Sequence, residues 1–280
     1  MTREQGRFTG AGGLRIFWQS WCPETAARAV IVIAHGASEH SGRYEHVAAR
    51  LVADGHAVYA IEHRGHGRSE GPRALIDRMD RAVEDLDALI VLAVGRHRDT
   101  PVFLLGHSMG ATLSLCYALR RQDRLSGLIL SGPLAALEPP PAPARAIARA
   151  LSALTPGLGI VAIDPNLVSR DPAVVAAYVA DPLVHHGRLP ARTVTELADA
   201  IRSFPERVAA ITIPTLLMYG TADGLCPPAG SMMLEQQLGA TDKTVRAYEG
   251  LHHEILNEPE QDQVLDDMSA WLAAHVAVRA

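Results

Sequence analysis

Short apolar runs alternate with longer amphipathic stretches along most of the chain. The apolar runs have the length of β-strands, and we expect strands at 14–21, 30–34, 57–61, 102–105, 127–130, 215–219 and 245–248. Apolar positions three or four residues apart predict helices at 43–54, 78–98, 109–121, 229–238 and 260–278. This alternation is typical of βαβ units around a mostly parallel sheet, with 14–21 as an antiparallel hairpin strand at its edge.

The alternation breaks between residues 134 and 211. That stretch opens with the proline-rich segment 138–143 and then predicts helices at 144–154, 172–180 and 191–203. A long helical insertion between two sheet strands is most simply a cap over the carboxyl edge of the sheet, where open α/β folds bind ligands. We therefore expect a core of residues 1–133 and 212–280, and a helical cap of residues 134–211 inserted between strands 6 and 7.

The sequence Gly106-His107-Ser108-Met109-Gly110 directly follows an apolar strand and precedes a helix. Glycines on both sides of Ser108 let strand and helix pass close together, so that the serine hydroxyl stands clear of the sheet. A simple strand-to-helix turn would also use these glycines, but the chain goes on to supply partners for a nucleophile. We expect Ser108 to be that nucleophile, with the amides of Met109 and Ala37 as oxyanion donors.

Serine is a weak nucleophile at neutral pH and needs a base and an orienting acid. Asp223 follows one predicted strand and the pair His252-His253 follows the next, at the same edge of the sheet as Ser108. Taken alone, Asp223 could be a turn aspartate that binds loop amides. The chain order Ser, Asp, His is that of the α/β-hydrolase triad. The spacing does not separate His252 from His253.

Composition narrows the possible partners and the compartment. The 280 residues include 26 basic and 31 acidic side chains for a formal charge of −5, and the arginines are scattered among acids, which disfavours nucleic acid. Cys22, Cys116 and Cys226 form no C-x-x-C pair, so a disulfide framework is not expected. No apolar run reaches the length of a membrane span, and the N-terminus lacks a signal-peptide pattern. We expect a cytoplasmic protein, a monomer or weak homodimer.

The remaining histidines do not suggest a cofactor. Their spacing fits no zinc motif, and the run His252-His253-Glu254 is too compact to chelate one ion through all three side chains. No glycine-rich phosphate loop is present. We therefore expect no metal and no cofactor.

Several segments resemble the monoacylglycerol lipase family: 35–44, 62–71, 104–110 and 248–253, and in the cap 169–172 and 178–187, which look like the bacterial, actinobacterial-type branch. The resemblance implies the α/β-hydrolase fold. It also implies Ser108 as nucleophile, Asp223 as acid and His253 as base, with oxyanion donors at Ala37 and Met109. It further implies that Tyr178 approaches the glycerol end of the site. Cys226 matches a cysteine near the active site of animal relatives, although a buried apolar filler is the alternative.

The chain departs from this family at three positions. Glu62 stands where the family usually has Asp, Ser38 replaces a frequent Gly, and Ala111 replaces the second Gly of G-H-S-M-G-G. We interpret the first two as loop details. The methyl group of Ala111 could narrow the pocket and so alter substrate preference.

The cap bears on the substrate. Apolar residues from Ile147 to Leu158, Leu154 among them, recur at about helical spacing opposite arginines, and the apolar segment 160–163 follows. They either pack against the core or form an acyl tunnel whose outer lip, with Leu154 and Ile160, contacts lipid and brings the protein to a membrane surface. The resemblance implies hydrolysis of monoacylglycerols. The alternatives are a broader carboxylesterase or lysophospholipase, and a catalytically silent small-molecule-binding module.

Overall fold

The computed structural model describes residues 1–137 and 141–277. Within these residues, one sheet holds the strands in the order β1-β2-β4-β3-β5-β6-β9-β10. Their bounds are β1 (Thr2–Thr9), β2 (Arg15–Cys22), β3 (Val30–Ala34), β4 (Ala57–Ile61), β5 (Val102–His107), β6 (Gly127–Ser131), β9 (Thr215–Gly220) and β10 (Lys243–Tyr248). Neighbouring strands from β4 to β10 are parallel, whereas β2 is antiparallel to both β1 and β4. This is the predicted mostly parallel sheet.

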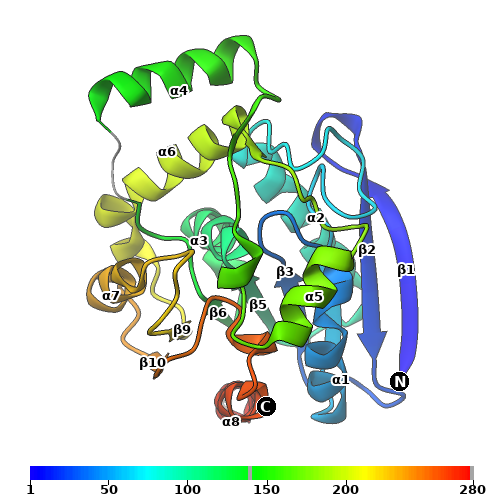
Figure 1. Cartoon of the computed structure of the whole chain (residues 1–280). Coiled ribbons are helices and arrows are strands. Elements are labelled where there is room, and N and C mark those ends of the chain that lie inside the picture. The colour runs from blue at the N-terminus through cyan, green and yellow to red at the C-terminus, as the bar shows by residue number, and fades with distance from the viewer. Residues whose placement is uncertain (138–140, 278–280) are drawn as a thin grey trace.

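Helices cover both faces of the sheet (Figure 1). The bounds are α1 (Glu45–Ala53), α2 (Met79–Arg96), α3 (Met109–Arg121), α7 (Pro228–Gln237) and α8 (Gln261–Ala277). Buried side chains of α2, α3 and α7 share one hydrophobic cluster with one face of the strands, and those of α1 and α8 share another with the opposite face. Residue 278 of the predicted last helix lies outside the described residues.

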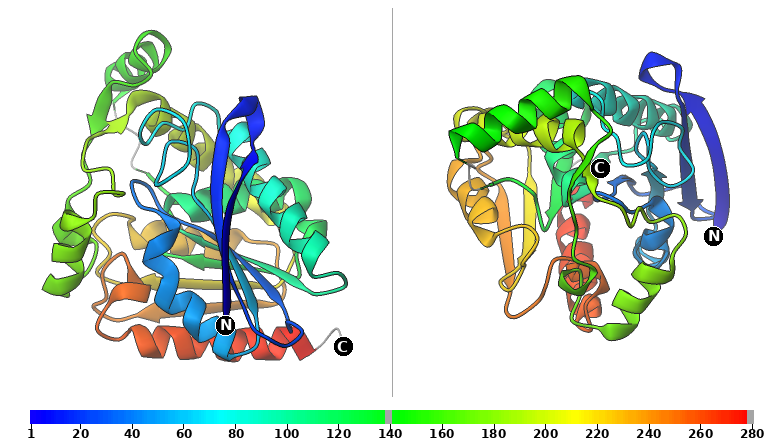
Figure 2. Two further views of the ribbon diagram at one scale, coloured as in Figure 1. Left: turned by 90° about the vertical axis from the view of Figure 1, so that its right-hand side faces the viewer. Right: turned by 45° about the horizontal axis from the view of Figure 1, so that its top comes forward.

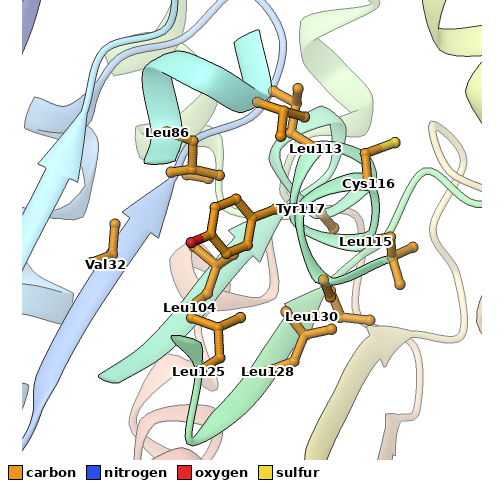
Figure 3. Close-up of a cluster of buried hydrophobic side chains, with 14 of the residues drawn as sticks. Val32, Leu86, Leu104, Leu113, Leu115, Cys116, Tyr117, Leu125, Leu128 and Leu130 are labelled. Carbon is orange, nitrogen blue, oxygen red and sulfur yellow. The ribbon is translucent and has the colours of Figure 1, made fainter. Parts of the chain in front are cut away.

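The core between α2, α3 and the sheet is packed tightly (Figure 3). Tyr117 of α3 lies among Leu86 of α2 and Leu104 of β5, and its hydroxyl donates to Asp87 at 3.0 Å. Cys116 lies in the same cluster, where burial raises the pKa of its thiol to about 11. This packing holds β5 and α3, the two elements on either side of Ser108, in a fixed relation.

The prediction that residues 14–21 form the edge strand of the sheet is wrong. Arg15–Cys22 lies between β1 and β4, and β1 is the edge. The sequence of β1, Thr-Arg-Glu-Gln-Gly-Arg-Phe-Thr, is polar, and most of its side chains are exposed. An exposed edge strand carries no apolar pattern by which the sequence could reveal it.

The helices expected in the insertion are confirmed, and they lie between β6 and β9 at the carboxyl edge of the sheet (Figure 1). The elements are α4 (Ala142–Leu154), β7 (Gly159–Val161), α5 (Pro172–Ala180), β8 (Leu189–Pro190) and α6 (Ala191–Arg207). The β7–β8 pair was not predicted, and α6 continues past the expected end through Pro205, which lies in its last turn. The division of the chain at residues 134 and 211 stays a prediction.

Helix α4 forms the outer end of this insertion. It packs on α6, and Figure 2 shows it at the opposite end of the molecule from α8. Among the described residues, no helix is long and apolar enough to cross a membrane.

Candidate active site

Ser108 lies at a sharp turn between β5 and α3. Its φ of 53° and ψ of −119° are outside the regions that ordinary residues favour, as expected for a strained elbow. A side chain at Gly106 would collide with Ser114, and one at Gly110 would collide with the carbonyl oxygen of Ala34. The glycines of the motif therefore permit the close strand–helix crossing that projects Ser108 from the sheet.

Asp223 and His253 form a buried pair beside this turn. His253 Nδ1 lies 2.7 Å from Asp223 Oδ2, while Asp223 Oδ1 accepts from the amides of Leu225 at 2.9 Å and Cys226 at 2.8 Å. A carboxylate only accepts, so the proton of the neutral imidazole lies on Nδ1 and leaves Nε2 as the base. His252 instead borders a separate surface cavity beside α5. The structure thus pairs His253, and not His252, with Asp223.

Two glycines let the loops of the site approach one another. A side chain at Gly220, at the end of β9, would collide with the carbonyl of Leu251. Gly132 has a φ of +49°, and a Cβ there would lie 2.9 Å from the carbonyl oxygen of His253 and 3.5 Å from Asp223 Oδ2. Sequence reasoning missed Gly132. The signal available was a Gly-Pro pair directly after β6.

The thiol of Cys226 lies between Ser108, the predicted nucleophile, and His253, the predicted base. Its Sγ is 3.7 Å from Ser108 Oγ and 3.9 Å from His253 Nε2. Among the described residues, no hydrogen bond joins Ser108 directly to His253, so Ser108 Oγ must turn toward Nε2 for proton transfer, a tightening common when substrate binds. Cys226 therefore lies next to the predicted nucleophile and the predicted base.

Asp223, Cys226 and His253 are the only group with metal-ligand spacing in the part of the chain that the structure describes. Ligand atoms of Asp223, Cys226 and His253 lie within 4.8 Å of one another. Asp223 Oδ1 accepts two backbone hydrogen bonds and Oδ2 accepts one from His253, while Cys226 and His253 border the pocket. A metal ion on Asp223 would compete with its hydrogen bond to His253.

Two histidines at the site differ in charge preference. Burial lowers the pKa of His253, but the Cys226 sulfur and the hydrogen-bonded Asp223 carboxylate raise it, and the net shift is upward. His107 packs against His253 with ring centroids 4.7 Å apart and the ring planes tilted by 45°. Burial lowers the pKa of His107 to about 4, so this ring stays neutral at physiological pH. Only His253 is thus suited to carry a positive charge during a reaction.

The predicted oxyanion donors belong to two segments that meet at Ser108. Met109 is the first residue of α3, and Ala37 lies in the loop after β3. A Cβ on Gly36 would be 3.2 Å from Ser108 Cβ, so this loop passes directly over the nucleophile. No hydrogen bond within the described residues uses the amide of Ala37 or Met109, and both remain available to a ligand.

A cavity of about 250 Å³ opens above Ser108. Its lining is apolar on the cap side and polar near His253, and it includes Ala37, Glu39, His107, Ser108, Leu134, Leu137, Val161, Ala162, Ile163, Val168, Tyr178, Leu189, Val194, Leu197, Leu225, Cys226, His253 and Glu254. Of the predicted substrate contacts, Tyr178 and Cys226 border it. Leu154 and Ile160 do not, and Leu154 is 81% exposed.

Comparisons with known proteins identify the family. The family model described as serine aminopeptidase, S33 matches residues 25–260. Monoacylglycerol lipase of Mycolicibacterium smegmatis is 44% identical over 276 residues, which cover 98% of this chain and 99% of that protein. The chain belongs to the monoacylglycerol lipase family. Human monoglyceride lipase is 33% identical over 271 residues, 95% of this chain and 89% of that protein.

Solved structures agree with the assignment to the monoacylglycerol lipase family. The crystal structure of Paleococcus ferrophilus monoacylglycerol lipase matches with a TM-score of 0.82 and 33% identity, covering 98% of this chain and all of that chain. The predicted family and the α/β-hydrolase fold are therefore confirmed, and the chain is a carboxylic ester hydrolase by family.

The positions that depart from the family pattern have distinct surroundings. Ala111 packs in the hydrophobic core and does not border the pocket, so the expectation that its methyl group narrows the pocket is wrong. Glu62 is buried and accepts from Ser41 Oγ at 2.9 Å. Ser38 has a φ of 68°, and its buried Oγ has no hydrogen-bond partner among the described residues. Ser38 thus adopts a conformation that glycine would adopt without strain.

Sequence reasoning missed a buried charge network at the polar end of the pocket. The Arg43 guanidinium makes two hydrogen bonds to Glu254, at 2.6 and 2.7 Å, and one to Glu39 at 3.0 Å. Its Cζ also lies 4.8 Å from the ring centroid of Tyr178. Arg43 therefore joins the Ala37 loop, the His253 loop and α5. Arg43 and Glu39 lie in a segment that resembles the family, but no local pattern pairs them with Glu254.

Proposed function

We propose that this chain hydrolyses monoacylglycerols to free fatty acid and glycerol, with Ser108 as nucleophile, His253 as base and Asp223 as acid. The observation that carries the proposal is the buried Asp223–His253 pair beside the elbow serine, at the floor of a mainly apolar pocket. The names of the relatives, monoacylglycerol and monoglyceride lipases, support the choice of substrate.

In the first step, His253 Nε2 takes the proton of Ser108 Oγ as this oxygen attacks the ester carbonyl. The carbonyl oxygen becomes an oxyanion, which the Ala37 and Met109 amides stabilise. The intermediate collapses, the bond to the glycerol oxygen breaks, and His253 donates its proton to that oxygen. Glycerol leaves, and the acyl group stays on Ser108.

In the second step, water replaces the serine as nucleophile. His253 takes a proton from water, the resulting hydroxide attacks the acyl carbonyl, and collapse returns the proton to Ser108 Oγ. Asp223 keeps His253 in the Nδ1–H tautomer and stabilises the imidazolium that forms in each step. The fatty acid then leaves.

The pocket favours a neutral polar head group over an anionic one. Apolar side chains of the cap would contact the acyl chain, while the end near His253 carries Glu39 and Glu254. Two carboxylates face the single guanidinium of Arg43, which leaves a net negative charge at that end. A lysophospholipid phosphate would be repelled there. Glycerol hydroxyls can donate hydrogen bonds to the same groups.

The central experiment measures turnover of a lipid panel by purified protein. We expect monoacylglycerols to be hydrolysed faster than diacylglycerols, lysophospholipids or short p-nitrophenyl esters. The reverse order would favour a broader carboxylesterase or lysophospholipase. Ser108→Ala should lower kcat by several orders of magnitude, and near-native activity in this variant would exclude the mechanism. Failure of a fluorophosphonate to label folded wild-type protein would instead favour a binding module.

We also propose that the cap contacts lipid surfaces through α4 and the segment after it. On α4 the one buried residue is Ser152, which faces Thr195 of α6 at 2.7 Å, whereas Ile147 and Leu154 are exposed. Leu158 and Val161, which follow α4, are exposed as well. Ile147 and Leu154 thus do not serve to pack the cap, and an exposed apolar surface of this kind is suited to a membrane interface.

Liposome flotation tests this contact. Ile147→Glu and Leu154→Glu should reduce the fraction of protein that floats with neutral vesicles, because a charge on the inserted face opposes burial among acyl chains. Val91→Glu is the matched control, since Val91 is an exposed apolar residue of α2, outside the cap. Equal flotation of the wild type and all three variants would remove the proposal of membrane contact.

A further inference from the structure

Three histidines that the proposed mechanism does not use lie together behind the Ala37 loop. His35, His63 and His66 are all buried, with the His35 ring centroid 4.5 Å from that of His63 and 5.4 Å from that of His66. Among the described residues, His63 has no hydrogen bond at either ring nitrogen and His66 has one. His35 is the one of the three whose two ring nitrogens both make hydrogen bonds. A buried ring held on both sides in this way points to a specific structural role.

The partners of His35 determine its protonation. The backbone N–H of His63 donates to His35 Nε2 at 3.0 Å, so Nε2 carries a lone pair. His35 Nδ1 lies 2.7 Å from the carbonyl oxygen of Gly36, which can only accept, so Nδ1 carries the proton. Burial, with the neighbouring His40, His107 and Arg43 adding to it, lowers the pKa of His35 to about 3. The ring is therefore neutral, with one defined tautomer.

The bond from His35 reaches the oxyanion donor through one peptide group. The Gly36 carbonyl and the Ala37 N–H belong to the same planar trans unit, in which they point in opposite directions. A hydrogen bond that fixes the direction of the carbonyl therefore fixes the direction of the Ala37 N–H. On the other side of Gly36, its own N–H donates to Glu39 Oε1, and Glu39 is held by Tyr44 and Arg43.

We propose that His35 is a positioning residue, whose Nδ1–H orients the Gly36–Ala37 peptide group so that the Ala37 amide points at the oxyanion. The inference rests on the proposed function, because it takes Ala37 as an oxyanion donor. Stabilisation of an oxyanion depends on donors that are already aligned before charge develops. Loss of the Nδ1 donor leaves the peptide free to tilt, and the effect falls on the transition state and not on binding of the substrate.

Two substitutions each remove one of the two hydrogen bonds of His35 and keep the other. In His35→Asn the amide nitrogen takes the place of Nδ1, so the donor to Gly36 is kept and the acceptor for His63 N–H is lost. In His35→Gln the amide oxygen takes the place of Nε2, so the acceptor is kept and the donor is lost. We expect His35→Gln to lower kcat at least about tenfold, because a misaligned donor forfeits part of what a removed one does, with KM near wild type. His35→Asn should keep most of kcat.

Inhibition by a transition-state analogue provides a second test of the positioning role of His35. An alkyl trifluoromethyl ketone forms a tetrahedral adduct with Ser108 whose oxyanion occupies the same place. Its inhibition constant should rise in His35→Gln in parallel with the loss of kcat/KM, and change little in His35→Asn. His66→Gln is the control, because His66 packs in the same cluster but its Nδ1 bonds the carbonyl of Arg64. It should lower Tm without lowering kcat.

Equal losses of kcat in the Asn and Gln variants, or no loss in either, would overturn the positioning role of His35. Should neither variant fold, the tautomer can be read from wild-type protein with ¹⁵N-labelled, assigned histidines. A neutral ring with its proton on Nδ1 is expected, and a proton on Nε2 would overturn the inference. Failure of the proposed function is distinguishable, since Ser108→Ala would then keep its activity whatever the His35 variants do.

Discussion

At the carboxyl edge of the sheet, Ser108, Asp223 and His253 are each at most 8% exposed, whereas Leu154 at the end of α4 is 81% exposed. The first region is held by backbone crossings that tolerate no side chain at Gly110, Gly132 or Gly220. Helix α4 contacts α6 through Ser152 and Thr195, and it exposes the apolar side chains of Ile147 and Leu154. The residues that we propose for the chemistry are thus held by packing, whereas the surface that we propose for lipid contact lies where packing constrains the side chains little.

The largest loss of activity should follow from removal of the negative charge of Asp223, at the buried carboxyl edge of the sheet. Asp223→Asn keeps the shape of the side chain, but its amide can donate to His253 Nδ1 and so favour the wrong tautomer. We expect kcat to fall by roughly 10,000-fold, with Tm changed little, as measured by turnover of a monoacylglycerol and by calorimetry. A loss below tenfold would mean that Asp223 is not the partner on which His253 depends.

A single methyl group should also disturb this edge. Gly132→Ala adds a Cβ at a φ of +49°, 2.9 Å from the carbonyl oxygen of His253 and 3.3 Å from its Nδ1. The His253 loop must shift by a fraction of an ångström or more, and misplacement of about 1 Å costs about 100-fold in rate. We expect kcat to fall by up to that factor. Gly157→Ala, where a Cβ meets nothing within 4 Å, is the control and should leave kcat unchanged.

Some residues and elements of these two regions could be predicted from the sequence, and others could not. Ser108 and Asp223 follow apolar strands directly, and the local pattern places them. The partners Arg43 and Glu254 are 211 residues apart, so only the folded chain brings them together. For α4, helical spacing located an apolar stripe but could not say whether a neighbour covers it. The polar strand β1 and the glycine at 132 carry no periodic signal at all.

Low pH should destabilise the folded protein through the buried histidines near the site, and not through the exposed histidines of the cap. Burial lowers the pKa of His35 and of His66 to about 3, against about 6.5 in an unfolded chain. Below pH 6.5 the unfolded chain therefore binds more protons, and stability falls as pH falls, by about 1.4 kcal/mol per pH unit for each histidine. Asp85 opposes one of them, because burial raises its pKa to about 6 and the folded state gains that proton first.

His35 and His66 less the Asp85 offset leave one histidine, and His63 and His107, whose pKa values burial also lowers, add to it. The net expectation is therefore a loss of more than about 1.4 kcal/mol per pH unit between pH 6 and pH 4. Urea unfolding at a series of pH values measures it. His186→Gln, a change at an exposed cap histidine, should leave the slope as it is. An unfolding free energy that is constant from pH 6 to pH 4 would contradict the neutral, buried state of the His35 cluster.

A smaller change should strengthen the rigid edge. Ser38→Gly removes a residue with φ of 68° and a buried, unpartnered hydroxyl, and relief of the strain exceeds the added flexibility of the unfolded chain by about 1 kcal/mol. Tm should rise while kcat stays the same. Ser41→Gly is the opposite case, because Ser41 Oγ is bonded to Glu62, and it should lower Tm. A fall of Tm in Ser38→Gly would show that the loop needs the serine.

The smallest change in stability is expected for a substitution on α4, the exposed region of the cap. Leu154→Ala removes a side chain that is already 81% exposed, so the free energy of unfolding should change by less than about 0.5 kcal/mol. Leu104→Ala, within the core shown in Figure 3, should cost about 2–5 kcal/mol. Denaturant unfolding of both variants gives the contrast. If Leu154→Ala cost more than about 1 kcal/mol, α4 would be packed against protein in solution, and its apolar face would not be free to meet a membrane.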